Sequence, residues 1–339
     1  MTCTLVTGGG GFVGQHLAAA LLARGERVRI LDLRSPASCP AGAQYLQGSV
    51  LDPTLLRAAL DDVDRVYHLA ALPGMWMPNK GDFQAVNCRG TETVLAAARE
   101  RGVSRFLHCS TESILFGRSN KEAVITESVS TTPDDMPGAY TRSKMLAEQC
   151  ALRAAASGFP VVVANPTMPI GPHRNLTPPT EMVRYFLRRR VQVYFDFVLN
   201  LVDVRDVAAG LLLAMERGQV GRRYILGGED VTLGKLLATI GAISGREALR
   251  VPVPAGFAQM TAAVMEFMAD RVTRRPPAAT VEGVRIASRS RPLSIELSRR
   301  ELGYAPRPIE PALREVVASF LTDSKKPYYE PAASYKSEF

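Results

Sequence analysis

Residues that build metal sites, disulfide frameworks and membrane spans are scarce in this sequence of 339 residues. Its five cysteines are scattered and form no CxxC pair, so neither a disulfide framework nor a zinc site is indicated. Its four histidines stand far apart, a spacing that predicts no metal site. No run of 18 apolar residues occurs, and the chain enters a strand pattern at Cys3 without the features of a signal peptide. We therefore expect a cytoplasmic protein that holds no metal.

Acidic residues are fewer than basic residues, 33 against 41, so the net charge is +8. Much of the excess is local, because residues 271–300 hold eight arginines against Glu282 and Glu296. Such an imbalance can indicate an anionic partner. No nucleic-acid recognition motif and no interleaving of aromatic and basic residues accompany the charge, so nucleic acid is not an expected partner.

Short apolar runs alternate with helical patterns through the first half of the chain. This order predicts a doubly wound α/β fold, in which helices cover both faces of a parallel sheet. The expected strands are residues 3–7, 27–32, 64–70, 104–110 and 160–165, and the expected helices lie near residues 12–24, 53–61, 82–101 and 139–157.

A proline-rich stretch that begins at Pro166 marks a change in the composition of the chain. We expect a first domain made of residues 1–166 together with about 201–228, and a smaller substrate lobe made of residues 167–200 and 229–322. The polar residues 323–339 are expected to form a flexible tail.

A glycine-rich motif, Thr-Gly-Gly-Gly-Gly-Phe-Val-Gly, follows the first expected strand. Gly8 permits a tight turn, Gly11 lets the backbone approach a pyrophosphate, and Gly14 lets the following helix pack closely on the strand. Phe12 and Val13 begin that helix, and its N-terminus stabilises phosphate charge. The motif in this context predicts a loop that binds a dinucleotide.

The choice of dinucleotide depends on two residues. Asp32 ends the second expected strand, 24 residues after Gly8. Its carboxylate could accept hydrogen bonds from both hydroxyls of the adenine ribose and would repel a 2′-phosphate, which favours NAD. Arg34 could instead hold that phosphate, so NADP stays open.

Tyr140 and Lys144 lie four residues apart in an expected helix and therefore share one face. A phenol with a pKa of about 10 is a poor base at neutral pH, and a neighbouring ammonium, together with the positive nicotinamide ring, favours the phenolate. Tyr140 is the expected proton carrier, and Lys144 would also bind the nicotinamide ribose. Ser110 and Thr111 end the strand between the two motifs, where Thr111 would hydrogen-bond a substrate oxygen. The combination predicts a redox enzyme.

Several motifs follow one another along the chain in a fixed order. They are Thr7 to Gly14, His68 to Ala71, Asn87 to Thr91, Ser110 and Thr111, Tyr140 with Lys144, and Asn165 with Pro166. This set resembles the signature of the extended short-chain dehydrogenase/reductase superfamily over nearly the whole chain. The segments Leu201 to Val207 and Arg223 to Gly228 are most similar to the hopanoid-associated epimerase group, whose neighbours are dihydroflavonol reductases and 3β-hydroxysteroid dehydrogenase/decarboxylases.

The resemblance implies a Rossmann fold with a C-terminal substrate-binding lobe. It implies that Leu69, Ala70 and Ala71 line the cofactor. It also implies that Asn87 stabilises the central active-site helix and that Pro166 begins the segment closing over the nicotinamide. Relatives often pair through two helices of the first domain, so a homodimer is an open expectation.

Three positions depart from the family pattern. Gly48-Ser49 stands where many relatives have Gly-Asp, which puts one adenine contact in doubt. The loop after Thr111 is one residue longer than the common pattern, so Glu112 is interpreted either as a second acid/base or as a solvated loop residue, and the latter is favoured. Arg205 stands where the similar group has an acid, and we expect a surface difference without mechanistic consequence.

Two segments bear on the substrate. Trp76 follows the strand that ends near Ala71, where it would overhang the substrate site or pack in the core. The stretch Pro252 to Met268 combines Met and Phe with few charges, so we expect it in the core of the second lobe, with binding to a lipid or to the inner face of a membrane left open.

The expected reaction is the oxidation of a secondary ring alcohol, the 3β-hydroxyl of a sterol-like or triterpenoid substrate. Decarboxylation can follow where a β-keto acid results. The alternative is a nucleotide-sugar epimerase/dehydratase. A dinucleotide-sensing regulator without turnover is disfavoured, because the chain has every proton-transfer residue.

Overall fold

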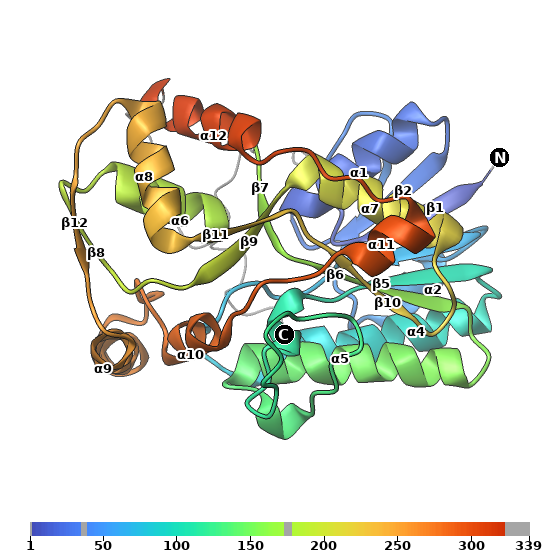
Figure 1. Cartoon of the computed structure of the whole chain (residues 1–339). Helices are drawn as coiled ribbons and strands as arrows, with labels where there is room; N and C mark the ends of the chain where they lie inside the picture. Colours follow the sequence, from blue (N-terminus) through green and yellow to red (C-terminus); the bar gives the residue numbers. More distant parts are fainter. Residues whose placement is uncertain (1, 35–38, 173–177, 323–339) are drawn as a thin grey trace.

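The structure is a computed structural model that describes residues 2–34, 39–172 and 178–322. The described chain forms two lobes, one built on a large parallel sheet and one on smaller sheets and helices (Figure 1). The tail expected over residues 323–339 lies outside the described residues. Among the described residues, no helix is long and apolar enough to cross a membrane.

The larger lobe contains a seven-stranded sheet in which every pair of neighbours is parallel. Along the sheet the order is β10-β6-β5-β4-β1-β2-β3. The bounds are β1 Cys3–Thr7, β2 Arg27–Asp32, β3 Gln44–Gln47, β4 Arg65–His68, β5 Arg105–Cys109, β6 Val161–Pro166 and β10 Arg223–Leu226. The five strands expected from the sequence are present, and the prediction of a doubly wound parallel fold is confirmed.

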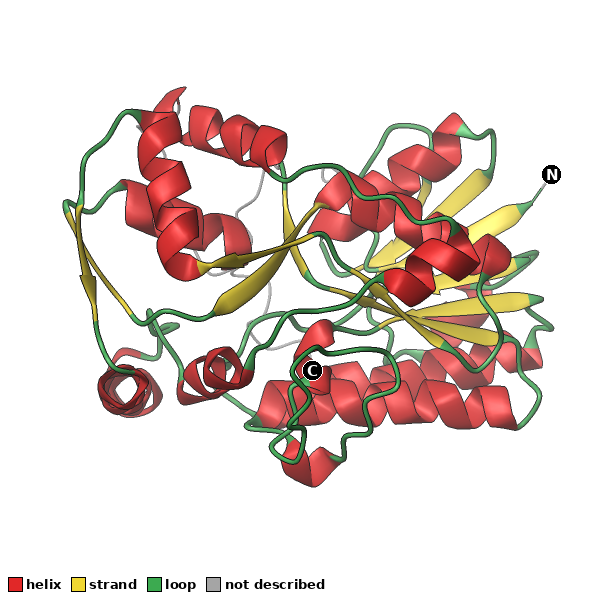
Figure 2. Ribbon diagram, in the orientation of Figure 1, coloured by secondary structure: helices red, strands yellow, loops and turns green. Residues whose placement is uncertain are grey.

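Helices cover both faces of this sheet (Figure 2). One face carries α1 (Phe12–Ala23), α7 (Val204–Arg217) and α11 (Glu296–Leu302), and the other carries α2 (Pro53–Ala59), α4 (Gly90–Glu100) and α5 (Ala139–Ala156). The strands are buried on both sides, so their side chains alternate between two apolar cores. Val6 and Ile30 belong to the core beneath α1 and α7, whereas Leu5 and Leu31 belong to the core beneath α2 and α4.

The helix expected over residues 82–101 has three parts. α3 (Gly81–Phe83) leads into a π-helical segment, Gln84–Arg89, which continues into α4. π-Helical turns are rare and are often found at functional sites. Here the turn contains Asn87. Short 3-10 helices at Glu112–Leu115 and Pro133–Asp135 lie between β5 and α5.

The second lobe begins after β6. A three-stranded sheet has the order β11-β9-β7, from β7 (Met168–Ile170), β9 (Val198–Asp203) and β11 (Glu229–Thr232). Helices α6 (Pro178–Leu187), α8 (Leu233–Ser244) and α12 (Glu310–Thr322) pack around it. β8 (Val191–Tyr194) and β12 (Leu249–Pro252) form a separate parallel ribbon, followed by α9 (Ala255–Met268), a π-helical turn (Ala269–Thr273) and α10 (Val281–Arg289).

Candidate active site

The glycine loop leaves no room for side chains. Gly8 has a φ of 72°, and its N–H donates to the Leu31 carbonyl at 2.8 Å. A Cβ on Gly8 would lie 2.7 Å from the amide nitrogen of Ala70, and a Cβ on Gly14 would lie 2.3 Å from the carbonyl oxygen of Gly8. The turn and the packing of α1 therefore both need glycine.

The start of α1 suits an anion. Gly11 has no side chain to cap the helix, and the first turn, which includes Phe12 and Val13, has no acidic residue. The carboxylate of Asp32 accepts hydrogen bonds from the N–H of Gly10 and of Arg34, each at 2.9 Å. These residues fit a dinucleotide, with phosphate at the helix N-terminus and a ribose at the carboxylate.

Arg34 lies at the same loop, because its guanidinium donates to the Gly10 carbonyl at 3.0 Å. A cation and an anion therefore both flank the place where the adenine ribose is expected. Asp32 favours a ribose with free hydroxyls, and Arg34 is positioned to accept a 2′-phosphate.

The segment after β4 is held beside this loop by a buried histidine. The two ring nitrogens of His68 contact the hydroxyls of Thr7 at 2.7 Å and Thr91 at 2.9 Å. Burial, with the nearby charge of Lys144, lowers the pKa of His68 to about 3, so the imidazole is neutral. The Thr7 hydroxyl also accepts from the N–H of Ala70 at 3.3 Å. Leu69, Ala70 and Ala71 thus lie against the glycine loop.

Asn87 joins this segment to α5. Its Oδ1 accepts from the N–H of Leu72 at 2.7 Å, and its Nδ2 donates to the hydroxyl of Ser143 at 2.9 Å. The Ser143 hydroxyl donates in turn to the carbonyl of Tyr140 at 2.7 Å. Asn87 therefore positions the turn of α5 that carries Tyr140, and the relay through Ser143 was not foreseen from the sequence.

Tyr140, Lys144 and Thr111 come together at the carboxyl ends of β5 and β6. The Lys144 ammonium is buried and donates to the Cys109 carbonyl at 2.9 Å, and the side chain of Asn165 donates to the Thr111 carbonyl at 3.1 Å. Burial lowers the pKa of Lys144. Burial, followed by the charge of Glu112, raises the pKa of Tyr140, whereas the Thr111 hydroxyl opposes this rise. The protein groups alone thus raise the pKa of Tyr140, and the predicted preference for the phenolate depends on the positive nicotinamide ring as well as on Lys144.

Glu112 is half-buried and held by hydrogen bonds, in contrast to the freely solvated loop residue that was favoured. Its carboxylate accepts from the Thr111 hydroxyl at 3.0 Å and from the Ser113 hydroxyl at 3.4 Å. Burial raises the pKa of Glu112 to about 7, against the hydrogen bonds that it accepts. The extra residue in this loop therefore brings an acid of near-neutral pKa next to Tyr140 and Thr111.

A second carboxylate, Glu282 of α10, holds the N-terminus of α5. It accepts from the N–H and hydroxyl of Thr141, both at 2.7 Å, and from the N–H of Tyr140 at 3.2 Å. Negative charge at a helix N-terminus is favourable. Sequence reasoning missed Glu282, because 141 residues separate it from Thr141 and no local motif links them.

Buried hydroxyls at the same edge lack partners. Ser110, after β5, and Thr167, after β6, each have a buried side-chain oxygen without a hydrogen-bond partner among the described residues. Pro166 ends β6 next to Thr167. A parallel α/β sheet with a glycine cradle, an acidic residue ending β2 and a buried tyrosine–lysine pair is typical of a dinucleotide-dependent oxidoreductase.

Comparison with known proteins identifies the family. The NAD dependent epimerase/dehydratase family matches residues 4–227. The chain is 34% identical over 328 residues to a putative dihydroflavonol 4-reductase of Synechocystis sp., with 94% of each chain covered. It is 31% identical over 327 residues to sterol demethylase protein B of Methylococcus capsulatus, with 94% of this chain and 98% of that one covered. The crystal structure of UDP-glucose 4-epimerase from Thermus thermophilus in complex with NAD covers 95% of this chain and 100% of its own, with a TM-score of 0.74 at 23% identity.

The chain therefore belongs to the NAD dependent epimerase/dehydratase family, in agreement with the resemblance found in its sequence. It is an enzyme of the extended short-chain dehydrogenase/reductase type. The prediction that its cofactor is NAD(P) is confirmed by its family. The assignment of individual site residues stays a prediction that rests on the geometry above.

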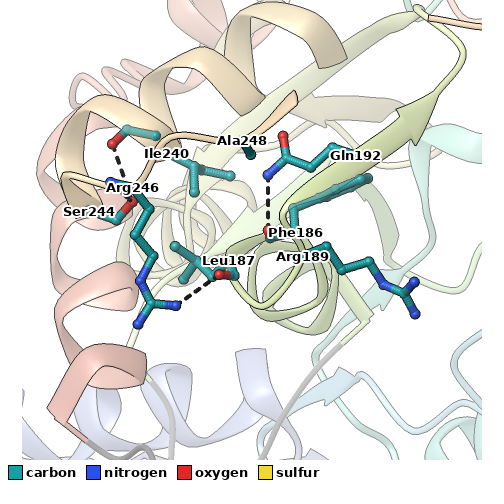
Figure 3. A pocket seen from close by; sticks show the side chains of 9 residues that line it. Phe186, Leu187, Arg189, Gln192, Ile240, Ser244, Arg246 and Ala248 are labelled. Carbon is teal, nitrogen blue, oxygen red and sulfur yellow. Dashed lines mark hydrogen bonds between the residues drawn. The ribbon is translucent and has the colours of Figure 1, made fainter. Parts of the chain in front are cut away.

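Two other features lie outside this site. A small hollow between α6, β8 and α8 is lined by residues of the second lobe, with the side chain of Gln192 donating to the Phe186 carbonyl at 2.9 Å (Figure 3). None of the predicted site residues lines it. Cys88, Glu92 and Cys150 bring three potential metal-ligand atoms within 4.8 Å, but Arg153 donates to the Cys150 sulfur at 3.0 Å, and its positive charge opposes a cation there.

Proposed function

We propose that this enzyme oxidises a secondary ring alcohol, the 3β-hydroxyl of a sterol-like or triterpenoid substrate, with NAD as the cofactor. The observation that carries the proposal is the convergence of Tyr140, Lys144 and Thr111 at the carboxyl edge of the sheet. Gly8, Gly11, Gly14 and the N-terminus of α1 would hold the pyrophosphate, and Asp32 would hold the adenine ribose.

The residues divide the chemistry between them. Bound NAD would supply the hydride acceptor. Tyr140, as the phenolate, takes the proton from the substrate hydroxyl, while the carbinol carbon loses hydride and becomes a carbonyl. The Lys144 ammonium stabilises the phenolate, and the Thr111 hydroxyl donates to the substrate oxygen. Where a carboxylate is β to the new ketone, carbon dioxide leaves, the electrons of the broken bond form the enolate of that ketone, and the enolate takes a proton from water without a further catalytic group.

The substrate class is supported by the similarity to sterol demethylase protein B over nearly the whole chain. A nucleotide-sugar epimerase/dehydratase is the alternative, supported by the family to which the chain belongs. That reaction uses the same oxidation and then returns the hydride, so it produces no net NADH. We also propose that the enzyme acts in the cytoplasm and forms a homodimer.

The test is absorbance at 340 nm with NAD or NADP and a panel of 3β-hydroxysterols, 4-carboxy sterols and UDP- or GDP-sugars. Steady accumulation of NADH with a sterol supports the proposal. A sugar nucleotide converted to a new stereoisomer or to a dehydrated product without net NADH overturns it in favour of the alternative.

Replacement of the proton carrier sharpens this test. Tyr140→Phe should lower turnover by about 10²-fold or more while NAD binding is retained, because only the general acid/base is lost. Tyr304→Phe is the matched control, because the Tyr304 hydroxyl is buried without a partner among the described residues and lies against α7. Equal turnover in the two variants would contradict the role of Tyr140.

A further inference from the structure

Helix α9 exposes large apolar side chains to solvent. Among the described residues, thirteen large apolar side chains are exposed, and seven of them lie between residues 257 and 272. These seven are 41% to 63% exposed and comprise Phe257, Met260, Val264, Met265, Phe267, Met268 and Val272. The expectation that this stretch forms the core of the second lobe is therefore wrong.

An ordinary surface helix turns its apolar side to the protein, whereas α9 turns its apolar side to solvent. Its buried side is narrow and contains Ala262, with Ala269 directly after the helix. On that side Glu266 accepts from the Lys80 ammonium at 2.8 Å, and Asp270 accepts from the Trp76 indole at 2.7 Å. Charged residues thus attach the helix to the protein while its apolar side faces water. Exposed apolar patches of this kind mark interaction surfaces.

Positive charge continues from the apolar side. Arg271, Arg274 and Arg275 follow α9, are exposed and take part in none of the ion pairs formed by the described residues. At the other end, the β8–β12 ribbon runs directly into α9 (Figure 1), and Val191, Val193 and Leu249 on the ribbon are 51%, 53% and 65% exposed. The surface therefore has an apolar centre flanked by arginines that form no ion pair among the described residues, of which Arg274 also lies close enough to Asp270 for its charge to lower the pKa of that carboxyl.

We propose that α9, the arginine run and the β8–β12 ribbon form a docking surface for an anionic phospholipid bilayer. The apolar side chains would enter the boundary between headgroups and acyl chains, and the guanidinium groups would bind headgroup phosphates. A second copy of the chain fits less well, because the same patch on that copy is also apolar and positively charged and offers the arginines no negative charge. Charge complementarity therefore selects the bilayer.

The docking surface is tied to the proposed active site. The loop that contains Trp76 and Lys80 contacts α9, and it follows the segment that lines the glycine loop. α10 packs on α9 and supplies Glu282 to the N-terminus of α5. A bilayer bound at α9 would therefore lie against the loop and the helix that connect α9 to the proposed active site. The docking itself does not rest on the proposed reaction.

Trp76 offers a direct readout, because it is the only tryptophan and it contacts Asp270 beside this surface. The experiment measures energy transfer from Trp76 to a dansyl lipid in vesicles of phosphatidylcholine with about 30% phosphatidylglycerol, and in vesicles of phosphatidylcholine alone. We expect binding to the anionic vesicles that weakens at about 0.5 M salt. Phe257→Gln/Phe267→Gln and Arg271→Glu/Arg275→Glu should each lower the affinity roughly tenfold or more.

Val124→Gln/Val220→Gln is the matched control, because both valines are exposed elsewhere, at 47% and 48%. Flotation of the vesicles and the thermal unfolding temperature of each variant show whether a loss of signal is a loss of binding or of folding. No binding to anionic vesicles, or unchanged binding by folded α9 variants, overturns the proposal. A dimer that dissociates in the Phe257→Gln/Phe267→Gln variant, with no vesicle binding by the native chain, overturns it in favour of a second copy. NADH formation from a substrate dissolved without vesicles tests the proposed reaction independently.

Discussion

A single carboxyl group, that of Glu112, links the protonation of the candidate site to pH. Its pKa of about 7 means that it is neutral in mildly acidic solution and negative above that pH. The negative charge raises the pKa of Tyr140. If Tyr140 must be a phenolate to accept the substrate proton, Glu112→Gln should shift the rising limb of the kcat/KM profile to lower pH by about half a unit to one unit.

The measurement is kcat/KM between about pH 6 and pH 10. Glu122→Gln is the control, because Glu122 is exposed in the same connection between β5 and α5.

The dependence of stability on pH gives a second test of Glu112. Glu112 has a higher pKa folded than unfolded, so the folded state retains its proton between about pH 4.5 and 7, and its contribution to stability is lost as the pH rises through that window. The free energy of unfolding of the native chain should therefore fall by about 1–3 kcal/mol more than that of Glu112→Gln as the pH rises from acidic to alkaline. Unchanged profiles in both measurements would show that the carboxyl does not act at the site.

At the scale of an element, the N-terminus of α5 depends on a glycine. A Cβ on Gly138 would lie 2.2 Å from the Oε2 atom of Glu282, so any side chain displaces the carboxylate from the helix N-terminus. Gly138→Ala should lower the free energy of unfolding by about 1–3 kcal/mol, because backbone donors of α5 lose their buried acceptor. Activity should fall as well, since Tyr140 lies in the first turn of the helix.

Gly256→Ala is the matched substitution, because nothing lies within 4 Å of a Cβ at Gly256 in α9. Urea unfolding and kcat of both variants are compared. A loss of stability in Gly138→Ala with unchanged kcat would limit Glu282 to a structural role. Equal stability of the two variants would contradict the contact itself.

What the sequence predicts at this scale depends on how local the signal is. The glycine motif, the spacing of Tyr140 and Lys144 and the short apolar runs are local patterns, so the loop, the helix and the positions of five strands along the chain were readable. β3 was missed because Gln44–Gln47 is a short edge strand with polar ends. The roles of Glu282 and of the apolar side of α9 arise from packing between distant segments, which periodicity does not report. The raised pKa of Glu112 could not be predicted either, because its loop becomes partly buried only in the folded chain.

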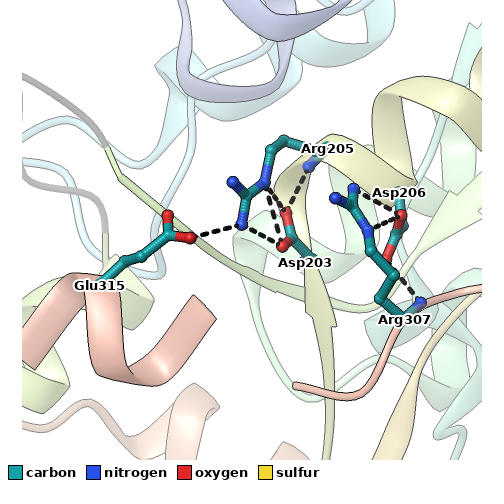
Figure 4. A network of polar contacts seen from close by, with 5 residues as sticks. All are labelled: Asp203, Arg205, Asp206, Arg307 and Glu315. Atoms are coloured by element: carbon teal, nitrogen blue, oxygen red, sulfur yellow. Dashed lines mark hydrogen bonds and ion pairs between the residues drawn. The ribbon is translucent and has the colours of Figure 1, made fainter. Parts of the chain in front are cut away.

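At the scale of the whole molecule, an ion-pair network connects the two lobes (Figure 4). Asp203 ends β9 and is 3% exposed, and Arg205 of α7 binds it through Nε and Nη2 while also reaching Glu315 of α12 at 3.2 Å. Nearby, Asp206 accepts from the backbone and guanidinium of Arg307, each at 2.8 Å. Arg205 is therefore more than a surface difference, because it pairs with the buried carboxylate of Asp203 and also contacts Glu315 of the second lobe.

Removal of Arg205 tests that connection. Burial would raise the pKa of Asp203, but the hydrogen bonds and charge of Arg205 keep it below its usual value. Arg205→Ala leaves that buried carboxylate without its main partner, which should cost about 1–3 kcal/mol. Arg314→Ala, which removes an exposed pair with Glu310, should cost about 0.5 kcal/mol or less.

The effect of Arg205→Ala should depend on pH. The contribution of Asp203 to the stability of the native chain is present above its unfolded pKa of about 3.9 and is lost as the pH falls through its folded pKa. The difference in unfolding free energy between the two variants should therefore be full near pH 7 and shrink below about pH 4. Urea unfolding at both pH values measures this difference, and equal costs at pH 7 would show that the pair of Arg205 with Asp203 does not stabilise the fold.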